Sequence, residues 1–75
     1  MNQAILLNSD LTFDESKSLW TLSGFYQSQG IVIYISEAKL ARDTFISSDL
    51  LFDLEADIED WLEVNEPDEN NEIWL

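Results

Sequence analysis

The chain reads SLWTLSGFYQSQGIVIYIS from residue 18 to residue 36, and this stretch decides the fold. Residues 18–26 partly alternate between polar and apolar side chains, and residues 31–35 are β-branched or aromatic throughout. A four-residue loop, 27–30, ends in Gly and separates the two runs. The pattern predicts a β-hairpin with strands at about 18–26 and 30–36. Because 31–35 has no polar face, we expect a central strand, covered on both sides or lying against a helix.

Two short apolar runs at the ends of the chain extend this sheet. Residues 3–7 predict a strand, and Asn8-Ser9-Asp10 after them is a turn signal. Residues 72–75 carry three large apolar side chains, which would be a liability if fully exposed, so we expect them to dock as an edge strand. Residues 11–17 have no clear pattern, although Phe13 is expected to be buried.

Two helices are predicted between the hairpin and the last strand. Ser36 is a suitable N-cap and Glu37 suits the first turn, so the first helix is expected at about 37–46. Ser48 or Asp49 caps a second helix at about 49–64, which Pro67 stops before a polar linker. On a helical wheel one arc of this second helix is apolar, comprising Leu50, Leu51, Leu54, Ile58, Trp61 and Leu62. The opposite arc is acidic, comprising Asp49, Asp53, Asp57, Glu59, Asp60 and Glu63, with Glu55 at its margin.

The predicted fold is therefore one α+β domain over residues 1–75. It has two layers, an antiparallel sheet of three to four strands with two helices packed on one face. The absence of Cys and His removes disulfides, zinc–thiolate sites and the commonest general base. Nothing after Met1 reads as a secretory signal or a membrane span, so we expect a cytoplasmic protein.

Charge is divided unevenly along the chain. The last 33 residues carry 12 carboxylates and no basic residue, whereas the first 42 have a formal net charge of −1. The total of −13 argues against direct binding to nucleic acid or to anionic membranes, because both are polyanions.

The acidic helix face is the main candidate for function. Asp53, Asp57 and Asp60 lie at helical spacing about 5–6 Å apart, close to the spacing of phosphates along a DNA strand. This array is a solvated face, a docking site for a basic protein surface, or a DNA mimic that inhibits a nucleic-acid-binding protein. Phe52 lies among the acids and either packs under the linker at 47–48 or anchors a partner. The candidate partner-binding residues are thus Phe52, Asp53, Asp57, Asp60 and Glu63.

Other constellations are weaker. Oxygen-bearing side chains alternate at 66, 68, 70 and 72 but lack the Gly and distal Glu of a calcium-binding loop. Paired carboxylates on an exposed helix offer no cleft that would raise a pKa for catalysis. We therefore predict no enzyme, no cofactor and no metal site. Core packing is expected for Trp61 and Trp74, while strand alternation places Trp20 on the open sheet face. A monomer or a weak homodimer is expected, the dimer through pairing of 72–75 or 31–35.

Several segments together resemble the YrdB-like proteins, small uncharacterised domains of gammaproteobacteria. The resemblance rests on the opening residues 1–5, Phe13-Asp14-Glu15, the hairpin, Ile35-Ser36-Glu37 with Leu40-Ala41, Phe52-Asp53-Leu54-Glu55 and the closing Ile73-Trp74-Leu75. It implies a two-layer α+β fold and brings no established activity or catalytic residues. Relatives are longer by about two helical turns before Phe52 and often have Cys in the hairpin, which this chain lacks. Together, the residue patterns and the resemblance lead us to predict a small non-enzymatic interaction module.

Overall fold

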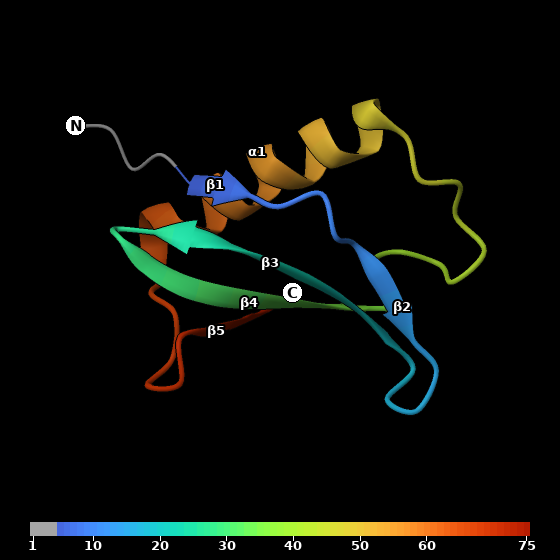
Figure 1. Cartoon of the computed structure of the whole chain (residues 1–75), viewed down its shortest axis with the longest axis horizontal. Helices are drawn as coiled ribbons and strands as arrows, with labels where there is room; N and C mark the ends of the chain where they lie inside the picture. The colour runs from blue at the N-terminus through green and yellow to red at the C-terminus, as the bar shows by residue number, and fades with distance from the viewer. Residues whose placement is uncertain (1–4) are drawn as a thin grey trace.

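A long hairpin forms the centre of the sheet in the computed structural model, which describes residues 5–75 (Figure 1). Its strands are β3 (Leu19–Tyr26) and β4 (Gln29–Ser36), paired antiparallel over their whole length. The turn is shorter than the predicted four-residue loop, because Gln27 and Ser28 take φ values of 53° and 67° and reverse the chain in two residues. The hairpin is therefore confirmed and its loop boundaries are wrong.

Three short strands complete the sheet. β1 (Ile5–Leu7) and β2 (Thr12–Asp14) both pair antiparallel with the outer edge of β3. β5 (Glu72–Trp74) pairs parallel with β4 and lies at the opposite edge, which confirms the predicted edge strand. The predicted strand at 3–7 begins outside the described residues. β2 was not predicted, and the sheet is mixed rather than antiparallel.

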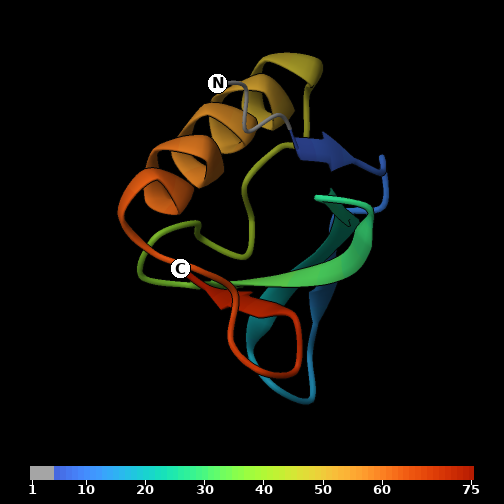
Figure 2. The same ribbon diagram turned by 90° about the vertical axis from the view of Figure 1, so that its left-hand side faces the viewer.

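The one helix of the described residues, α1 (Ser48–Val64), crosses one face of this sheet (Figure 2). Its N-cap is Ser47 rather than Ser48 or Asp49, and the Leu50 amide donates to the Ser47 hydroxyl at 3.2 Å. Its buried residues are Leu54, Ile58 and Leu62, one per turn, which meet the sheet. The buried core of the described residues is made up of Ile5, Trp20, Leu22, Ile31, Ile33, Ile35, Leu40, Leu54, Ile58, Leu62 and Ile73.

The helix predicted at 37–46 is wrong, because this segment forms a series of turns before α1 begins. The Leu40 carbonyl, which a helix would use within its own backbone, accepts instead from the indole Nε1 of Trp20 at 2.9 Å. Leu40 itself is 8 % exposed and packs into the core. A helix of ten residues is marginal on its own, so one tertiary hydrogen bond and one buried side chain are enough to replace it.

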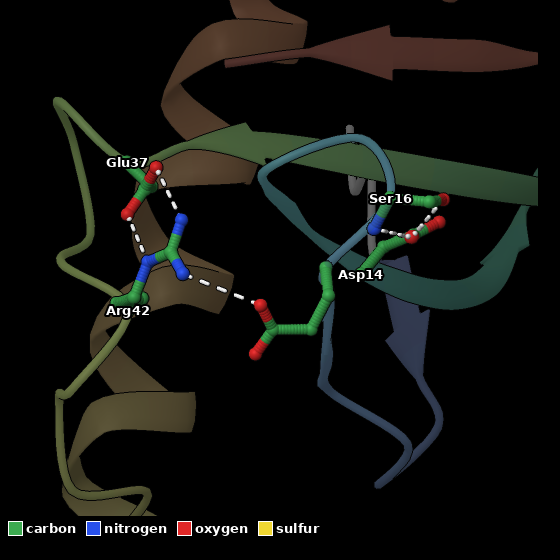
Figure 3. A network of polar contacts seen from close by, with 5 residues as sticks. Asp14, Ser16, Glu37 and Arg42 are labelled. Atoms are coloured by element: carbon green, nitrogen blue, oxygen red, sulfur yellow. Dashed lines mark hydrogen bonds and ion pairs between the residues drawn. The ribbon is translucent and has the colours of Figure 1, made fainter.

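Arg42 holds this segment against the rest of the molecule (Figure 3). Its guanidinium donates to both carboxylate oxygens of Glu37, at 2.7 and 3.3 Å, and to Glu15 beyond β2 at 3.3 Å. The same group lies 4.7 Å above the ring centroid of Phe13, which is half-buried. The hydrogen bond from Arg42 lowers the pKa of Glu37. Segment 37–47 is thus held by these side-chain contacts together with isolated backbone turns, such as the Leu40 amide donating to the Ser36 carbonyl at 3.0 Å.

The α+β class is confirmed, with five strands and one helix in the described residues instead of three to four strands and two helices. The all-apolar run at 31–35 is central, as predicted, but α1 covers only one of its faces. Its two edges are occupied by β3 and β5, so it is not available for pairing between two copies of the chain.

Candidate functional site

The outer side of α1 carries carboxylates that have no ion-pair partner among residues 5–75, with one exception. Asp53, Asp60 and Glu63 are exposed and unpaired. Asp57 is the exception, with its Oδ2 at 3.3 Å from the Nζ of Lys39, both side chains being about half exposed. Asp53, Asp57 and Asp60 follow one another at i, i+4 and i+7, so they form one row along the helix, here named the acidic row.

The basic side chains are occupied elsewhere in the molecule. Arg42 binds Glu15 and Glu37. Lys17 lies with its Nζ 5.7 Å from the ring centroid of Tyr34, on the face of the sheet away from α1. Among residues 5–75, Lys39 is the one basic side chain that reaches the acidic row. The uneven charge of the sequence therefore appears as an acidic surface on α1. The acidic row remains mostly uncompensated within the described part of the chain.

The five candidate residues do not form one site. Phe52 lines a groove of about 300 Å³ between β1 and the first half of α1. Asp57 and Asp60 line a depression of about 560 Å³ between α1 and the end of β5. Glu63 lines a third hollow, beside the hairpin turn and the segment after α1. The structure places the three Asp residues in one row, and Glu63 follows Asp60 at i+3 while lining a different hollow. Phe52 lies apart from all four.

Phe52 does not pack under the linker at 47–48, because its side chain is 75 % exposed. It lies on the shoulder of α1 that faces β1, since the other helical residues lining the same groove are Ser48, Leu51 and Glu55. Leu6, on β1, is 70 % exposed at the same groove. Phe52 is therefore an exposed apolar residue, placed on the opposite shoulder of α1 from the acidic row.

The depression beside the acidic row, here named the β5 depression, combines charge with apolar surface. Its lining residues are Lys39, Asp57, Asp60, Trp61, Val64, Asn65, Trp74 and Leu75. Val64 is 83 % exposed and Trp74 is 54 % exposed. Of these, only Asp57 and Asp60 were predicted to belong to the site. A strand alternation counted from buried Ile73 would have indicated the outward position of Trp74.

The two sheet tryptophans were predicted on the wrong faces. Trp20 is 5 % exposed on the core face and packs edge-on against Phe13, with ring centroids 5.4 Å apart. Trp74 lies on the open face, stacked on Tyr34 at 4.2 Å with an interplanar angle of 21°. The Tyr34 hydroxyl donates to Glu72 Oε2 at 3.2 Å, and burial followed by this hydrogen bond raises the pKa of Tyr34. The open face therefore carries an ordered aromatic pair.

The segment 66–72, in which every second side chain carries oxygen, includes a hydrogen-bonded turn at residues 68–72. Asp68 Oδ1 accepts from the amides of Asn70 and Glu72 at 2.9 and 3.0 Å, which fixes the turn. Within residues 5–75 no cluster of three or more acidic side chains is arranged to hold a metal ion. The same residues contain no helix that has both the length and the apolar character to cross a membrane.

A solved bacterial structure is similar to this chain over its whole length. No protein-family model matches the chain, and no curated protein matches it. The chain is similar to a crystal structure of a protein of unknown function. That protein is from Shewanella loihica PV-4 and belongs to the DUF1488 family. Its structure matches this chain with a TM-score of 0.67 and 26% sequence identity. The match covers 100% of this chain and 94% of that chain. It supports the likeness to a small uncharacterised bacterial family and gives no activity.

Proposed function

We propose that this protein is a non-enzymatic interaction module that binds a basic protein partner through the acidic row of α1. The observation that carries the proposal is the acidic row itself. Its three carboxylates lie along one side of α1, and of the three only Asp57 has an ion-pair partner within residues 5–75. A rigid helix presents these charges without the entropic cost of ordering a flexible tail. Complementary charge of this kind accelerates encounter and selects the partner.

The energetic cost of the row supports a role in binding. Asp53 and Asp57 are like charges at i, i+4, and Asp57 and Asp60 at i, i+3, which destabilise a helix by about 0.2–0.5 kcal/mol per pair. The last turn of α1 has no basic residue to complement the negative end of the helix dipole. A sequence selected for stability alone would not keep this arrangement, and a basic partner would relieve it.

The test is affinity capture from native lysate with a charge-matched pair of variants. The first carries Asp53→Asn, Asp57→Asn and Asp60→Asn. The second carries Asp43→Asn, Glu66→Gln and Glu69→Gln, which removes the same charge from exposed positions outside α1. We expect a partner captured at low salt to be lost by the first variant, kept by the second, and released as salt rises. Equal capture by both variants would refute the proposal.

The alternative role, a DNA mimic that inhibits a nucleic-acid-binding protein, is tested in the same experiment. It requires that duplex DNA displace the chain from whatever it captures, with weaker competition at higher salt. A captured partner that binds DNA and the chain at the same time would remove this alternative. The YrdB-like assignment and the cytoplasmic location belong to the same proposal and remain predictions.

A further inference from the structure

The edge of β5 has one residue whose peptide groups remain open. In the parallel ladder with β4, residues 71, 73 and 75 face β4, as shown by the Val32 amide bonding the Asn71 carbonyl and the Leu75 amide bonding the Tyr34 carbonyl. Residues 72 and 74 consequently face outward. The Glu72 amide and carbonyl are both bonded to Asp68, which closes that end of the edge. The N–H and C=O of Trp74 are left pointing out of the sheet.

The open position lies directly beside the β5 depression, because Trp74 is one of its lining residues. Asp57 and Asp60 from the acidic row lie on the α1 side of the same depression, together with Trp61 and Val64. A strand added to β5 would point alternate side chains toward α1. Each such side chain would pass over apolar surface before reaching the two carboxylates.

Lys39 shows what chemistry this position accepts. Its ammonium already pairs with Asp57 at 3.3 Å while both groups stay half exposed, and Asp60 next to it has no cation partner within residues 5–75. The stem of a long basic side chain from outside would pack on the apolar surface of Val64 and Trp61, and its charged end would reach a carboxylate. Arginine fits better than lysine, because its planar group binds a carboxylate in two contacts.

We propose that the partner docks as an extended segment on the edge of β5, with arginine side chains reaching into the β5 depression. The segment pairs with the open N–H and C=O of Trp74, and an arginine reaches Asp60 alongside Lys39 or replaces Lys39 at Asp57. This inference rests on the proposed function and adds the partner's conformation and residue type. It is strand addition at a short edge, with the specificity supplied by charge rather than by a long ladder of hydrogen bonds.

The experiment uses a labelled synthetic peptide of about nine residues, a common strand length, that alternates arginine and threonine. Two matched peptides accompany it, one with the arginines replaced by glutamine and one with N-methyl groups on the backbone amides of one edge. Binding to the full chain is followed by fluorescence anisotropy, and the Trp74 amide by NMR hydrogen exchange. We expect the parent peptide to bind and to slow exchange at Trp74.

Loss of either recognition element should weaken binding in a separable way. N-methylation removes the backbone pairing without changing charge, and about tenfold weaker binding is expected, which corresponds to one or two hydrogen bonds. Glutamine peptides, or the variant Asp57→Asn with Asp60→Asn, should also lose about tenfold. The exposed pair Glu66→Gln with Glu69→Gln removes the same charge and should have little effect.

Replacing Lys39 is a further test, in which binding of the peptide is expected to become tighter. Lys39→Gln removes the internal competitor and should tighten binding of the parent peptide about threefold, the scale of one exposed ion pair. Lys17→Gln changes the net charge equally on the far face of the sheet and should leave binding nearly unchanged. Equal tightening by both variants would mean that only the overall charge matters.

The outcomes separate this inference from the proposed function. If the N-methylated peptide binds as well as the parent, or if Trp74 exchange is unaffected, strand addition is refuted while the acidic row remains a candidate. If no arginine peptide binds but lysate capture still depends on the acidic row, the inference fails alone. If neither binding nor capture depends on Asp53, Asp57 and Asp60, both fail.

Discussion

The two faces of the sheet differ sharply although the same strands build both. On the face under α1, Leu22, Ile33 and Ile35 are at most 1 % exposed. On the open face, Phe25 and Trp74 are 51 % and 54 % exposed, and polar side chains lie between them. Burying apolar area supplies most of the stability, so the covered face should dominate unfolding and the open face should tolerate change. The difference indicates that stability is concentrated on the covered face of the sheet.

The largest effect is expected from Ile33→Ala in the centre of β4. Ile33 is fully buried between β3 and β5, and its truncation leaves a cavity under α1, at a cost of roughly 2–5 kcal/mol. Chemical denaturation followed by circular dichroism measures this loss. Val32→Ala, one residue away on the open face, is the matched control and should cost far less. Similar losses at both positions would contradict the comparison of the two faces.

Gly24→Ala tests the close approach of β1 to the core side of β3. A Cβ on Gly24 would run into the carbonyl oxygen of Leu6, which is backbone and cannot rotate away. The strands must separate, and we expect a loss of roughly 1–3 kcal/mol in the free energy of unfolding. Gly30→Ala is the control on the open face, where the nearest atom would be 4.0 Å away. Gly30→Ala should be neutral or slightly stabilising, measured by the same denaturation curves.

Trp20→Phe tests the contact that replaces the first predicted helix. The change keeps an aromatic ring in the core and removes the indole donor to the Leu40 carbonyl, so a loss of roughly 1–2 kcal/mol is expected. Amide exchange in segment 37–47 should accelerate at the same time. Trp74→Phe on the open face is the control. Unchanged exchange in Trp20→Phe would show that the Arg42 contacts alone hold the segment.

The hairpin, the acidic helix and the last strand could be predicted because each has a strong local signal. Residues 31–35 are β-branched or aromatic in an unbroken run, and α1 shows apolar side chains at the spacing of one helical face. Ile73 and its neighbours are apolar at a terminus, where exposure is unfavourable. In each case burial of the element and its local propensity indicate the same structure.

The remaining features depend on contacts between residues far apart in sequence. Segment 37–46 reads as a short helix, but Trp20 binds its carbonyl and Arg42 binds Glu15 across 27 residues. β2 has three residues and is defined only by its pairing with β3. Part of the candidate site was also not predictable from local sequence, for the same reason. The spacing of the Asp residues predicted the acidic row, but the position of Trp74 follows from the pairing of β5 with β4. The pairing of Lys39 with Asp57 follows from the position of segment 37–47 beside α1.

Asp10 gives the open side of the sheet a stability that depends on pH. Asp10 accepts hydrogen bonds from the Ser23 hydroxyl and from the Ser23 amide at 3.0 Å, and these lower its pKa below the ordinary value of 3.8. Ionised Asp10 therefore stabilises the fold above that pH, and the gain disappears as the pH falls through the lowered pKa. Asp10→Asn should cost about 1 kcal/mol near neutral pH and nearly nothing in strong acid. Asp43→Asn, a loss of charge at an exposed position, should show no such convergence.

The smallest effect is expected from Tyr34→Phe, which removes the hydroxyl from the aromatic pair and leaves the stacking on Trp74. Because the hydroxyl–Glu72 contact is only partly buried, the expected loss is under about 0.5 kcal/mol at neutral pH. Burial and Glu72 raise the pKa of Tyr34 above its ordinary value of 10.0. The contribution is therefore complete below pH 10.0 and is lost as the pH rises through the raised pKa.

Denaturation of Tyr34→Phe and the parent chain between pH 8 and pH 12 would follow this loss, the upper limit lying about two units above an ordinary tyrosine. The two curves should converge in alkali, and an ultraviolet titration should show one tyrosine ionising late. Glu72→Gln should bring that late ionisation to lower pH by removing the negative charge beside the hydroxyl. If Tyr34 instead titrates at its ordinary value, the aromatic pair is more open than the geometry indicates. Its neighbour Trp74 would then be correspondingly less fixed at the edge of β5.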